Sequence, residues 1–474
     1  MIPSPSPPLL HPEVRDYLIA RNYIDVELVQ LTPRRRDPEA KIATARLFNE
    51  MLGDPQAAYP AVQVAGTSGK GSVCLALSQI LLAAGQRTGL HVSPYLQVAT
   101  EKSWVDDRYI SGSEFRTACE VVRPVAEHFR HMEDCPTSVH GMASLALSYE
   151  AFRQRRIDWC VMETGVGGRF DLVQGLHRRL AVITDIGLDH VKSLGGTRPE
   201  IAWHKAGIMA GCEVALAVYD PETWPVFVAE SQRTGCRLER VVPEARSAFH
   251  ESADGALLVI ELPRLKTVEV PWPFPADGFQ RRNAVVAASA ADLLVAQGVP
   301  ITAEAIREGL LSRQMPGRLE RMQQGPEVLL DGAHNAQKMA ALMRSLPPFG
   351  GRRHLVLGAT GERHFSEVIG ALEERPWSVT VTRPLLYGKT VANIPEMVSQ
   401  VTRLGIPVSA KSAPVRAIRA VLERAGPADQ ILVTGSLYLV GQMRNLWYPW
   451  EEVLKQQTSW PIERCSTLAS PSTL

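Results

Sequence analysis

Short apolar runs alternate with longer amphipathic segments along the first two thirds of the chain. The runs have the length and content of buried strands, and the segments between them carry apolar residues at helical spacing. Strands are expected at residues 62–64, 88–92, 159–162, 180–184 and 214–218, and helices at 72–84, 113–129 and 142–154. Apolar strands separated by helices predict a mostly parallel sheet that is covered on both faces.

A second alternating set begins after residue 313, with strands expected at 328–330, 354–357, 378–381 and 431–433, and helices at 337–346, 365–373, 394–403 and 414–424. Between the sets, Met315-Pro316-Gly317 contains two helix breakers and predicts a hinge. We therefore expect an α/β protein with a P-loop-type domain over residues 1–314, a smaller Rossmann-like domain over 315–450 and a mobile tail over 451–474. Residues 242–278 are richer in proline and charge, and predict a β-rich excursion within the first domain.

Composition excludes several classes of protein. Lys and Arg number 51 and Asp and Glu 50, so no net field attracts nucleic acid or an anionic membrane. The seven cysteines form no C-x-x-C pair, which argues against a disulfide framework and favours the cytoplasm. The longest apolar stretch, 283–299, contains Asp292 and falls short of the ~18 residues that span a bilayer, so it predicts a buried helix. We expect neither a leader peptide nor an obligate interface, and hence a monomer.

A glycine-rich loop lies between the first predicted strand and the first predicted helix. It reads Gly66-Thr67-Ser68-Gly69-Lys70-Gly71-Ser72. The glycines allow a sharp turn, so that several backbone N–H groups can point at one phosphate. Lys70 can neutralise the outer phosphates of ATP, and the Ser72 hydroxyl can bind Mg²⁺. The loop is shorter than the standard P-loop, and a glycine-rich turn with a solvated lysine is the alternative; the order of strand, loop and helix favours nucleotide binding.

Glu163 ends another predicted strand, at the edge of the sheet where α/β proteins bind their ligands. A carboxylate at this position suits a hard cation such as Mg²⁺. The alternative is a glutamate that pairs with an arginine or faces solvent.

The loop resembles the nucleotide-binding loop of Mur ligases, in particular the folylpolyglutamate synthase and dihydrofolate synthase branch. Further segments resemble that branch in the same order over about residues 17–446. They are ETGVGGRFD at 163–171, IGLDH at 186–190, HKAGI at 204–208, QRRNA at 280–284, PGRLE at 316–320, DGAHN at 331–335 and TGSLYLVG at 434–441. Each is moderately specific, and the whole set in order is highly specific.

This resemblance implies a metal site beside the nucleotide. Ser72, Glu163 and His190 would hold two Mg²⁺ ions. Lys205 would carry CO₂ as a carbamate, which requires a neutral amine, and burial can supply one by lowering the lysine pKa. An ordinary helical lysine is the alternative.

The resemblance also implies roles on both sides of the hinge. Asn283 would face the adenine, Arg318 the phosphates and Asp331 the ribose of ATP. His334 would orient the incoming amino acid, unless it is a histidine at a helix N-terminus without a catalytic role. The site would form between the two domains, whose closure excludes water.

The chain departs from the family pattern on the acceptor side. Ser93-Pro94-Tyr95 stands where the family's acceptor-binding segment reads Ser-Pro-His, and Ser138-Val139-His140 replaces Phe-Phe-Glu. Two acceptors therefore stay open. The resemblance favours a folate to which L-glutamate is added, and the departures favour a non-folate carboxylate joined to an amino acid.

The implied reaction is ATP-dependent ligation of an acid to an amino acid. The acceptor carboxylate attacks the γ-phosphorus of ATP, and the amine then displaces phosphate from the acyl phosphate to give the amide and ADP. A P-loop kinase or ATPase would need no second domain that carries Asp331 and His334. A catalytically dead binding protein would be expected to lose Lys70, Glu163 or His190, and all three are present.

Overall fold

A computed structural model describes residues 10–28, 37–132, 134–252, 255–274, 278–312, 315–347, 349–372, 378–385 and 391–461. We call the described residues up to 312 the N-terminal lobe and those from 315 to 461 the C-terminal lobe. Residues 1–9, residues 313 and 314 just before the predicted hinge, and the part of the predicted tail beyond 461 lie outside the described residues.

The N-terminal lobe is built on an eight-stranded sheet with the order β4-β3-β2-β5-β1-β6-β7-β8. The strands from β2 to β8 in this order pair in parallel, whereas β3 pairs antiparallel with both β2 and β4. Their bounds are β1 Pro60–Ala65, β2 Thr88–His91, β3 Ser103–Val105, β4 Arg108–Tyr109, β5 Trp159–Glu163, β6 His177–Ile183, β7 Val214–Val218 and β8 Arg237–Val241. Every residue of β2, β5 and β7 is buried, as expected for strands covered on both faces.

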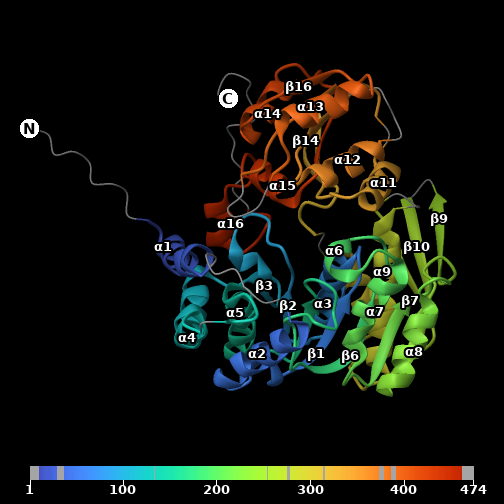
Figure 1. The fold of residues 1–474 in the computed structure, drawn as a ribbon. Helices are drawn as coiled ribbons and strands as arrows, with labels where there is room; N and C mark the ends of the chain where they lie inside the picture. Colours follow the sequence, from blue (N-terminus) through green and yellow to red (C-terminus); the bar gives the residue numbers. More distant parts are fainter. Residues whose placement is uncertain are drawn as a thin grey trace, which may run out of the picture.

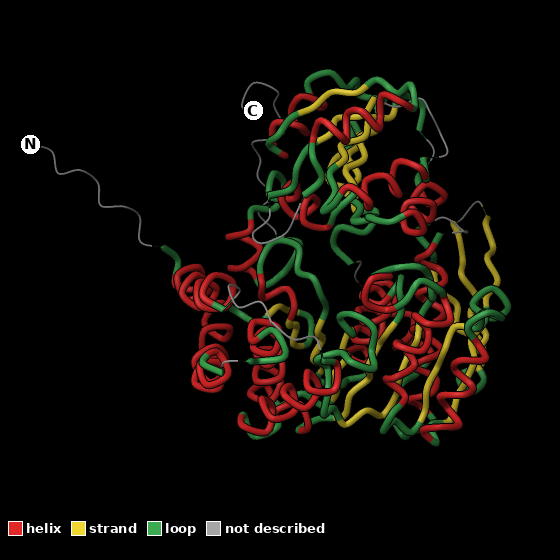
Figure 2. Tube along the Cα trace, viewed as in Figure 1, coloured by secondary structure: helices red, strands yellow, loops and turns green. Residues whose placement is uncertain are grey.

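Helices cover both faces of this sheet (Figures 1 and 2). They are α1 Pro12–Arg21, η1 Asn22–Glu27, α2 Pro38–Met51, η2 Pro55–Ala57, α3 Lys70–Ala83, η3 Ala99–Lys102, α4 Gly112–Arg130, α5 Val139–Arg155, α6 Val191–Leu194, α7 Arg198–Ala206, η4 Gly207–Met209, α8 Trp224–Thr234, α9 Phe279–Val295 and α10 Ala303–Ser312. The apolar stretch at 283–299 is the buried helix α9, and its Asp292 accepts hydrogen bonds from Arg264, whose Nη1 lies 3.0 Å from Oδ2. The buried charge is thus paired, as a buried carboxylate requires.

A separate antiparallel sheet lies within the 242–278 region. It consists of β9 Ser247–Ser252, β10 Gly255–Leu262 and β11 Lys266–Pro271. In β11, buried residues alternate with exposed ones, since one face packs on α10 and the other meets solvent. Figure 1 shows β9 and β10 at the outer edge of the N-terminal lobe.

The C-terminal lobe contains a six-stranded sheet with the order β12-β13-β17-β14-β15-β16, parallel except for β12. Its strands are β12 Glu320–Gln323, β13 Glu327–Leu330, β14 Arg353–Leu357, β15 Ser378–Val381, β16 Val408–Ala410 and β17 Gln430–Thr434. Its helices are α11 Ala336–Ser345, α12 Glu362–Gly370, α13 Ile394–Arg403, α14 Pro414–Leu422, α15 Leu437–Arg444 and α16 Trp450–Gln456. The predicted fold class, a large mostly parallel α/β sheet with a smaller second α/β sheet, is confirmed.

Apolar packing continues from one lobe into the other. The main core, which surrounds β1, α3 and α9, also includes Leu330, Val433 and Leu439 of the C-terminal lobe. A second core lies on the far face of the six-stranded sheet, and a third fills the space between β6, β7, α7 and α8. In Figure 1 the C-terminal lobe (orange to red) lies above the N-terminal lobe, with α11 and α6 near the junction.

The structure corrects the expected tail. Residues 451–461 are not a free segment, because α16 packs against α1, and Tyr109 N donates a 3.0 Å hydrogen bond to Gln457 O. The sequence interpretation overlooked Trp450 and Trp460, both of which pack against the main core. None of the helices in the described part of the chain is long and apolar enough to cross a bilayer.

Candidate active site

The glycine-rich loop joins β1 to α3 and requires glycine at two positions. Gly66 has φ 152°, and a Cβ there would lie 1.7 Å from Thr184 Oγ1. Gly69 precedes α3 with φ 83°, and a Cβ there would lie 2.2 Å from Asn283 Oδ1. The loop therefore passes so close to its neighbours that only residues without a side chain fit.

The segment after β6 holds the loop in place. Thr67 N donates to Asp185 O at 2.8 Å, and Thr67 Oγ1 donates to Gly187 O at 3.0 Å. Thr184 Oγ1 donates to Ser68 O at 2.6 Å. The buried Ser68 hydroxyl has no hydrogen-bond partner in the described part of the protein, which leaves a polar group available to a ligand.

Lys70 and Glu163 meet above the loop. Lys70 Nζ lies 3.9 Å from Glu163 Oε1, and Ser93 N donates to Glu163 Oε2 at 2.9 Å. Burial raises the pKa of Glu163, while Lys70 opposes the shift. Ser72 lies in the first turn of α3, and a Cβ on the adjacent Gly71 would lie 3.5 Å from Glu163 Oε2. The structure thus brings the predicted phosphate and metal residues of β5 and α3 together.

Lys205 reaches the same loop from α7. Its Nζ donates a 2.7 Å hydrogen bond to Gly66 O, and its side chain is buried. Burial, reinforced by Lys70, lowers the pKa of Lys205 to about 7. A large fraction of this amine is therefore neutral near neutral pH.

His190 lies at the start of α6, with φ 50° and a half-exposed side chain. Its backbone N donates to Asp189 Oδ1 at 2.9 Å. Burial lowers the pKa of His190, Asp189 opposes this, and the nearby Lys70 and Lys205 lower it further. The imidazole is thus neutral at neutral pH, the form that binds metals.

The predicted metal residues do not form a complete cage by themselves. Among the described residues, no group of three or more His, Cys, Asp or Glu side chains is arranged to hold a metal ion. Mg²⁺ is commonly held by one or two carboxylates together with substrate phosphates and water. Of the predicted metal residues, Glu163 lies next to the first turn of α3, which carries Ser72, and His190 is close enough to Lys70 for that lysine to lower its pKa.

Asp331 follows β13 and is buried. Its Oδ2 accepts from Leu319 N and its Oδ1 from Ala333 N, both at 2.8 Å. Burial raises the pKa of Asp331, and Arg318 opposes the shift. The carboxylate therefore fixes the turn that carries Arg318 and His334. A ribose hydroxyl bound there would donate to carboxylate oxygens that already accept from the N–H groups of Leu319 and Ala333.

Two residues predicted to bind the nucleotide, Arg318 and Asn283, have polar groups free for a ligand. Neither side chain forms a hydrogen bond or ion pair with any described residue. Arg318 lies near Gly332, where a Cβ would be 3.3 Å from its Nη1, and it influences the pKa of both Glu163 and Asp331. A guanidinium whose donors are free can bind a phosphate with two parallel hydrogen bonds.

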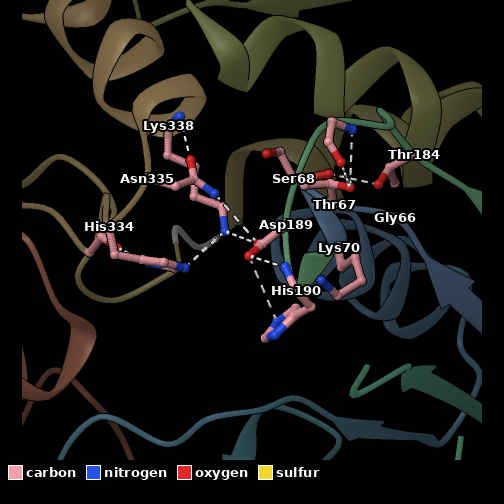
Figure 3. A network of polar contacts seen from close by, with 12 residues as sticks. Gly66, Thr67, Ser68, Lys70, Thr184, Asp189, His190, His334, Asn335 and Lys338 are labelled. Carbon is pink, nitrogen blue, oxygen red and sulfur yellow. Dashed lines mark hydrogen bonds and ion pairs between the residues drawn. The ribbon is translucent and has the colours of Figure 1, made fainter. Parts of the chain in front are cut away.

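Figure 3 shows a polar network across the junction of the lobes that includes a residue the sequence analysis missed. Lys338 Nζ of α11 lies 3.2 Å from Asp189 Oδ2 and 3.1 Å from His334 Nε2. Asn335 Nδ2 lies 3.5 Å from the same Asp189 oxygen. Lys338 lies on an amphipathic helix, where a lysine is normally exposed to solvent. Nothing in the sequence therefore indicated its contacts with Asp189 and His334.

His334 is held in one orientation within this network. Its Nδ1 lies 2.8 Å from Gly332 O, and because a carbonyl can only accept, Nδ1 carries the proton. Burial and Lys338 keep the pKa of His334 well below its ordinary value. His334 is therefore neutral, with Nε2 as its acceptor.

The departures on the acceptor side meet at one carboxylate. Tyr95 Oη donates to Asp25 Oδ2 at 3.2 Å, and His140 Nε2 lies 3.4 Å from Asp25 Oδ1. Lys102 Nζ lies 5.2 Å from the centre of the Tyr95 ring. Asp25 belongs to η1, and the sequence analysis did not connect it with these residues. Ser93 and Pro94 link this cluster to Glu163, since Ser93 bonds the carboxylate directly.

A separate cavity of about 540 Å³ lies beside α2 and is lined by Glu39, Arg46, Arg169 and Arg178 among others. It contains none of the predicted site residues. Arg169 also pairs with Glu230 at 2.8 Å. The cavity and the polar network are therefore distinct features.

Comparisons with known proteins find similarity over both lobes. The family model described as "Mur ligase middle domain" matches residues 64–291, and "Mur ligase, glutamate ligase domain" matches residues 317–437. A dihydrofolate synthase/folylpolyglutamate synthase of Bacillus subtilis is 31% identical over 403 residues, covering 83% of this chain and 92% of that protein. One from Mycobacterium tuberculosis is 31% identical over 366 residues, covering 73% of this chain and 74% of that protein.

A solved structure gives the same picture. The crystal structure of Mycobacterium tuberculosis folylpolyglutamate synthase, complexed with ADP and AMPPCP, superimposes with a TM-score of 0.79 at 26% identity. The match covers 92% of this chain and 98% of that one. The similarity thus extends over both lobes.

Proposed function

The chain belongs to the Mur ligase family, in the branch of the folylpolyglutamate and dihydrofolate synthases, and from this we propose that it joins L-glutamate to a folate. It is an ATP-dependent ligase that forms a carbon–nitrogen bond. The specific acceptor and amino acid are the part that we propose.

One observation carries the proposal: two lobes present complementary polar groups to one place. The N-terminal lobe supplies the glycine-rich loop with Lys70 and Glu163 in contact. The C-terminal lobe supplies Arg318, unpaired among the described residues, and the oriented His334. A kinase or ATPase requires the first set, whereas a ligase that also orients an amine requires both.

The metal and the modified lysine are parts of the proposal. Ser72, Glu163 and His190 would hold two Mg²⁺ ions together with the phosphates of ATP, and these ions would neutralise the developing phosphate charge. Lys205 has the partly neutral amine that a carbamate requires, and it is fixed against Gly66 of the loop. The carbamate would add a negative charge beside the metals.

The residues of this chain then act mainly through position and charge. The loop N–H groups and Lys70 bind the triphosphate, while Asn283 and Asp331 bind the adenine and the ribose. Lys70 and Arg318 stabilise the charge that spreads over the phosphoryl group as the acceptor carboxylate attacks it. His334 orients the amine that then attacks the acyl phosphate. Ser93, Pro94 and Tyr95 would position the acceptor next to Glu163.

We infer a monomer, and a cytoplasmic one because the described cysteines are unpaired.

A second acceptor is supported by the cluster at Asp25. Tyr95 and His140 stand where the family pattern has other residues, and both contact this carboxylate. Two coordinated departures at one point favour an altered acceptor site over drift at isolated positions. A non-folate carboxylate is therefore the alternative substrate of the same reaction.

The test is phosphate release from ATP and Mg²⁺ with panels of carboxylates and amino acids, followed by mass spectrometry of the product. We expect release to depend on both a folate and L-glutamate, with a mass gain of one glutamyl residue. Release that ignores the amino acid would indicate a kinase or ATPase. A product only with another carboxylate would replace the folate assignment. Lys70→Ala should abolish release, and activity close to that of the unmodified chain would remove the proposed site.

A further inference from the structure

Lys338 joins groups from both lobes at the proposed active site. It lies on α11 of the C-terminal lobe, and Asp189 lies on the N-terminal lobe between β6 and α6. Lys338 Nζ is 3.2 Å from Asp189 Oδ2 and 3.1 Å from His334 Nε2. Both side chains of the ion pair are largely buried, with 17% and 10% of their surface exposed. Such a pair exists only when the two lobes are close together.

The two oxygens of Asp189 have different partners. Oδ1 accepts from the backbone N of His190, which fixes the turn that carries this histidine. Oδ2 accepts from Lys338 and, at 3.5 Å, from Asn335, both in the C-terminal lobe (Figure 3). One carboxylate therefore connects the His190 turn with the segment that begins α11.

Lys338 completes this connection on the side of His334. The Nδ1 proton of His334 is held by Gly332 O, so Nε2 is the only ring nitrogen that can accept, and Lys338 donates to it. The pKa of Lys338 is lowered by burial to about 8, with Asp189 opposing the shift, so the amine is mostly charged at neutral pH.

We propose that Lys338 is a positioning residue that couples closure of the two lobes to the alignment of His334 with the Asp189–His190 turn. The inference rests on the proposed ligase function and extends it, because it names the residue that brings the amino-acid side of the site into register with the phosphate side. Lys338 acts through Asp189 and His334, whereas Lys70 and Arg318 act on the phosphates.

A direct phosphate contact by Lys338 is the competing role, and the two roles have different signatures. A phosphate ligand would contribute to ATP affinity independently of Asp189. A positioning residue would change ATP affinity much less than kcat, because the shared apolar core still holds the two lobes together. Its effect would also be shared with Asp189, since either change breaks the same pair. Removing one partner of a buried pair also leaves the other charge uncompensated, so the double variant should be no worse than the single ones.

The experiment compares Lys338→Met, Lys338→Arg, Asp189→Asn and the Lys338→Met/Asp189→Asn double variant. Arg344→Met is the matched control, because Arg344 lies on the same helix and is exposed. For Lys338→Met we expect a nucleotide Kd within about twofold of the unmodified chain and a roughly 100-fold loss in kcat for amide formation. The double variant should show the same loss as the worse single variant, Lys338→Arg should recover part of kcat, and Arg344→Met should behave as the unmodified chain.

A second readout does not depend on catalysis. Hydrogen exchange with AMPPCP bound should become faster in Lys338→Met at residues 187–194, which lie in the opposite lobe, and remain unchanged in Arg344→Met. A fall in nucleotide affinity equal to the fall in kcat, additive effects in the double variant, or unchanged exchange at 187–194 would each overturn the positioning role. If the unmodified chain forms no amide, the ligase assignment fails, and the exchange comparison still decides whether Lys338 couples the lobes.

Discussion

At the scale of single residues, the site depends on a few positions whose close neighbours leave no room for a side chain. Gly66 and Gly69 lie where a Cβ would overlap Thr184 and Asn283. These glycines were identifiable from the sequence, because a glycine-rich strand-to-helix turn has a known physical use. Thr184 was not, since a buried threonine at the end of a strand carries no signal until the loop is seen against it.

Gly66→Ala should therefore remove nucleotide binding and destabilise the N-terminal lobe. The added Cβ would stand 1.7 Å from Thr184 Oγ1 at φ 152°, so the loop must move away from β6. We expect a loss of at least about 2 kcal/mol in the free energy of unfolding. Urea unfolding with and without AMPPCP measures both effects. Gly196→Ala is the control, because a Cβ there meets nothing within 4 Å, and equal behaviour of the two variants would contradict the prediction.

The pKa of Lys205 leads to a prediction about pH. It is lowered from 10.5 to about 7, so between these values the unfolded chain holds a proton that the folded chain lacks. Stability therefore rises with pH across this window, and the penalty for burying the ammonium is fully present below pH 7. In CO₂-free buffer, Lys205→Met should be the more stable protein near pH 7, by an amount on the order of a few kcal/mol.

That difference should shrink as pH approaches 10, and urea unfolding at several pH values measures it. Adding CO₂ should stabilise the unmodified chain and leave Lys205→Met unchanged. A difference that stays constant with pH would show that the amine is not buried as described.

At the scale of elements, the sequence predicted the strands and helices that have a regular pattern of apolar residues. Apolar runs identified the parallel strands β1, β2, β5, β6 and β7, because strands buried on both faces are apolar throughout. The short strands β3 and β4 pair at the sheet edge and are too brief to give a pattern. The amphipathic pattern also located α11, but it concealed Lys338, whose contacts arise from the other lobe. Tertiary proximity, as at Asp25 and Tyr95, leaves no trace in local sequence.

The contact between α15 and the loop that contains the expected acceptor-binding segment gives a prediction at this scale. A Cβ on Gly441 of α15 would lie 1.9 Å from Leu96 O, next to the Ser93–Tyr95 segment. Gly441→Ala should push this loop away from α15, raising the KM for the acceptor by roughly tenfold while the KM for ATP stays within about twofold.

Steady-state kinetics in each substrate measure the effect. Gly370→Ala is the matched control, because that position is helical and a Cβ there meets nothing within 4 Å. An equal rise in both KM values would place the acceptor away from this loop.

At the scale of the whole molecule, the two lobes share structure as well as a site. The main core contains residues of β1 and α3 together with Leu330, Val433 and Leu439. Arg444 of α15 is fully buried, and its Nη1 donates to Gln97 Oε1 of the N-terminal lobe. Gln97 Nε2 in turn donates to Tyr448 O at 2.7 Å. The lobes are thus joined by apolar packing and by buried polar contacts, in addition to the Asp189–Lys338 pair.

This shared packing predicts how the protein unfolds. Because the main core includes residues of both lobes, loss of one lobe exposes apolar surface of the other, and we expect a single calorimetric transition. A ligand that binds only the folded protein stabilises it by mass action, so AMPPCP at 100 times its Kd should add about 2.7 kcal/mol. Since the proposed nucleotide site takes Lys70 from one lobe and Arg318 from the other, the shift should move the whole transition, and Lys70→Ala should abolish it. Two transitions, of which only the one for the N-terminal lobe responds to nucleotide, would show that ATP binds without engaging the C-terminal lobe.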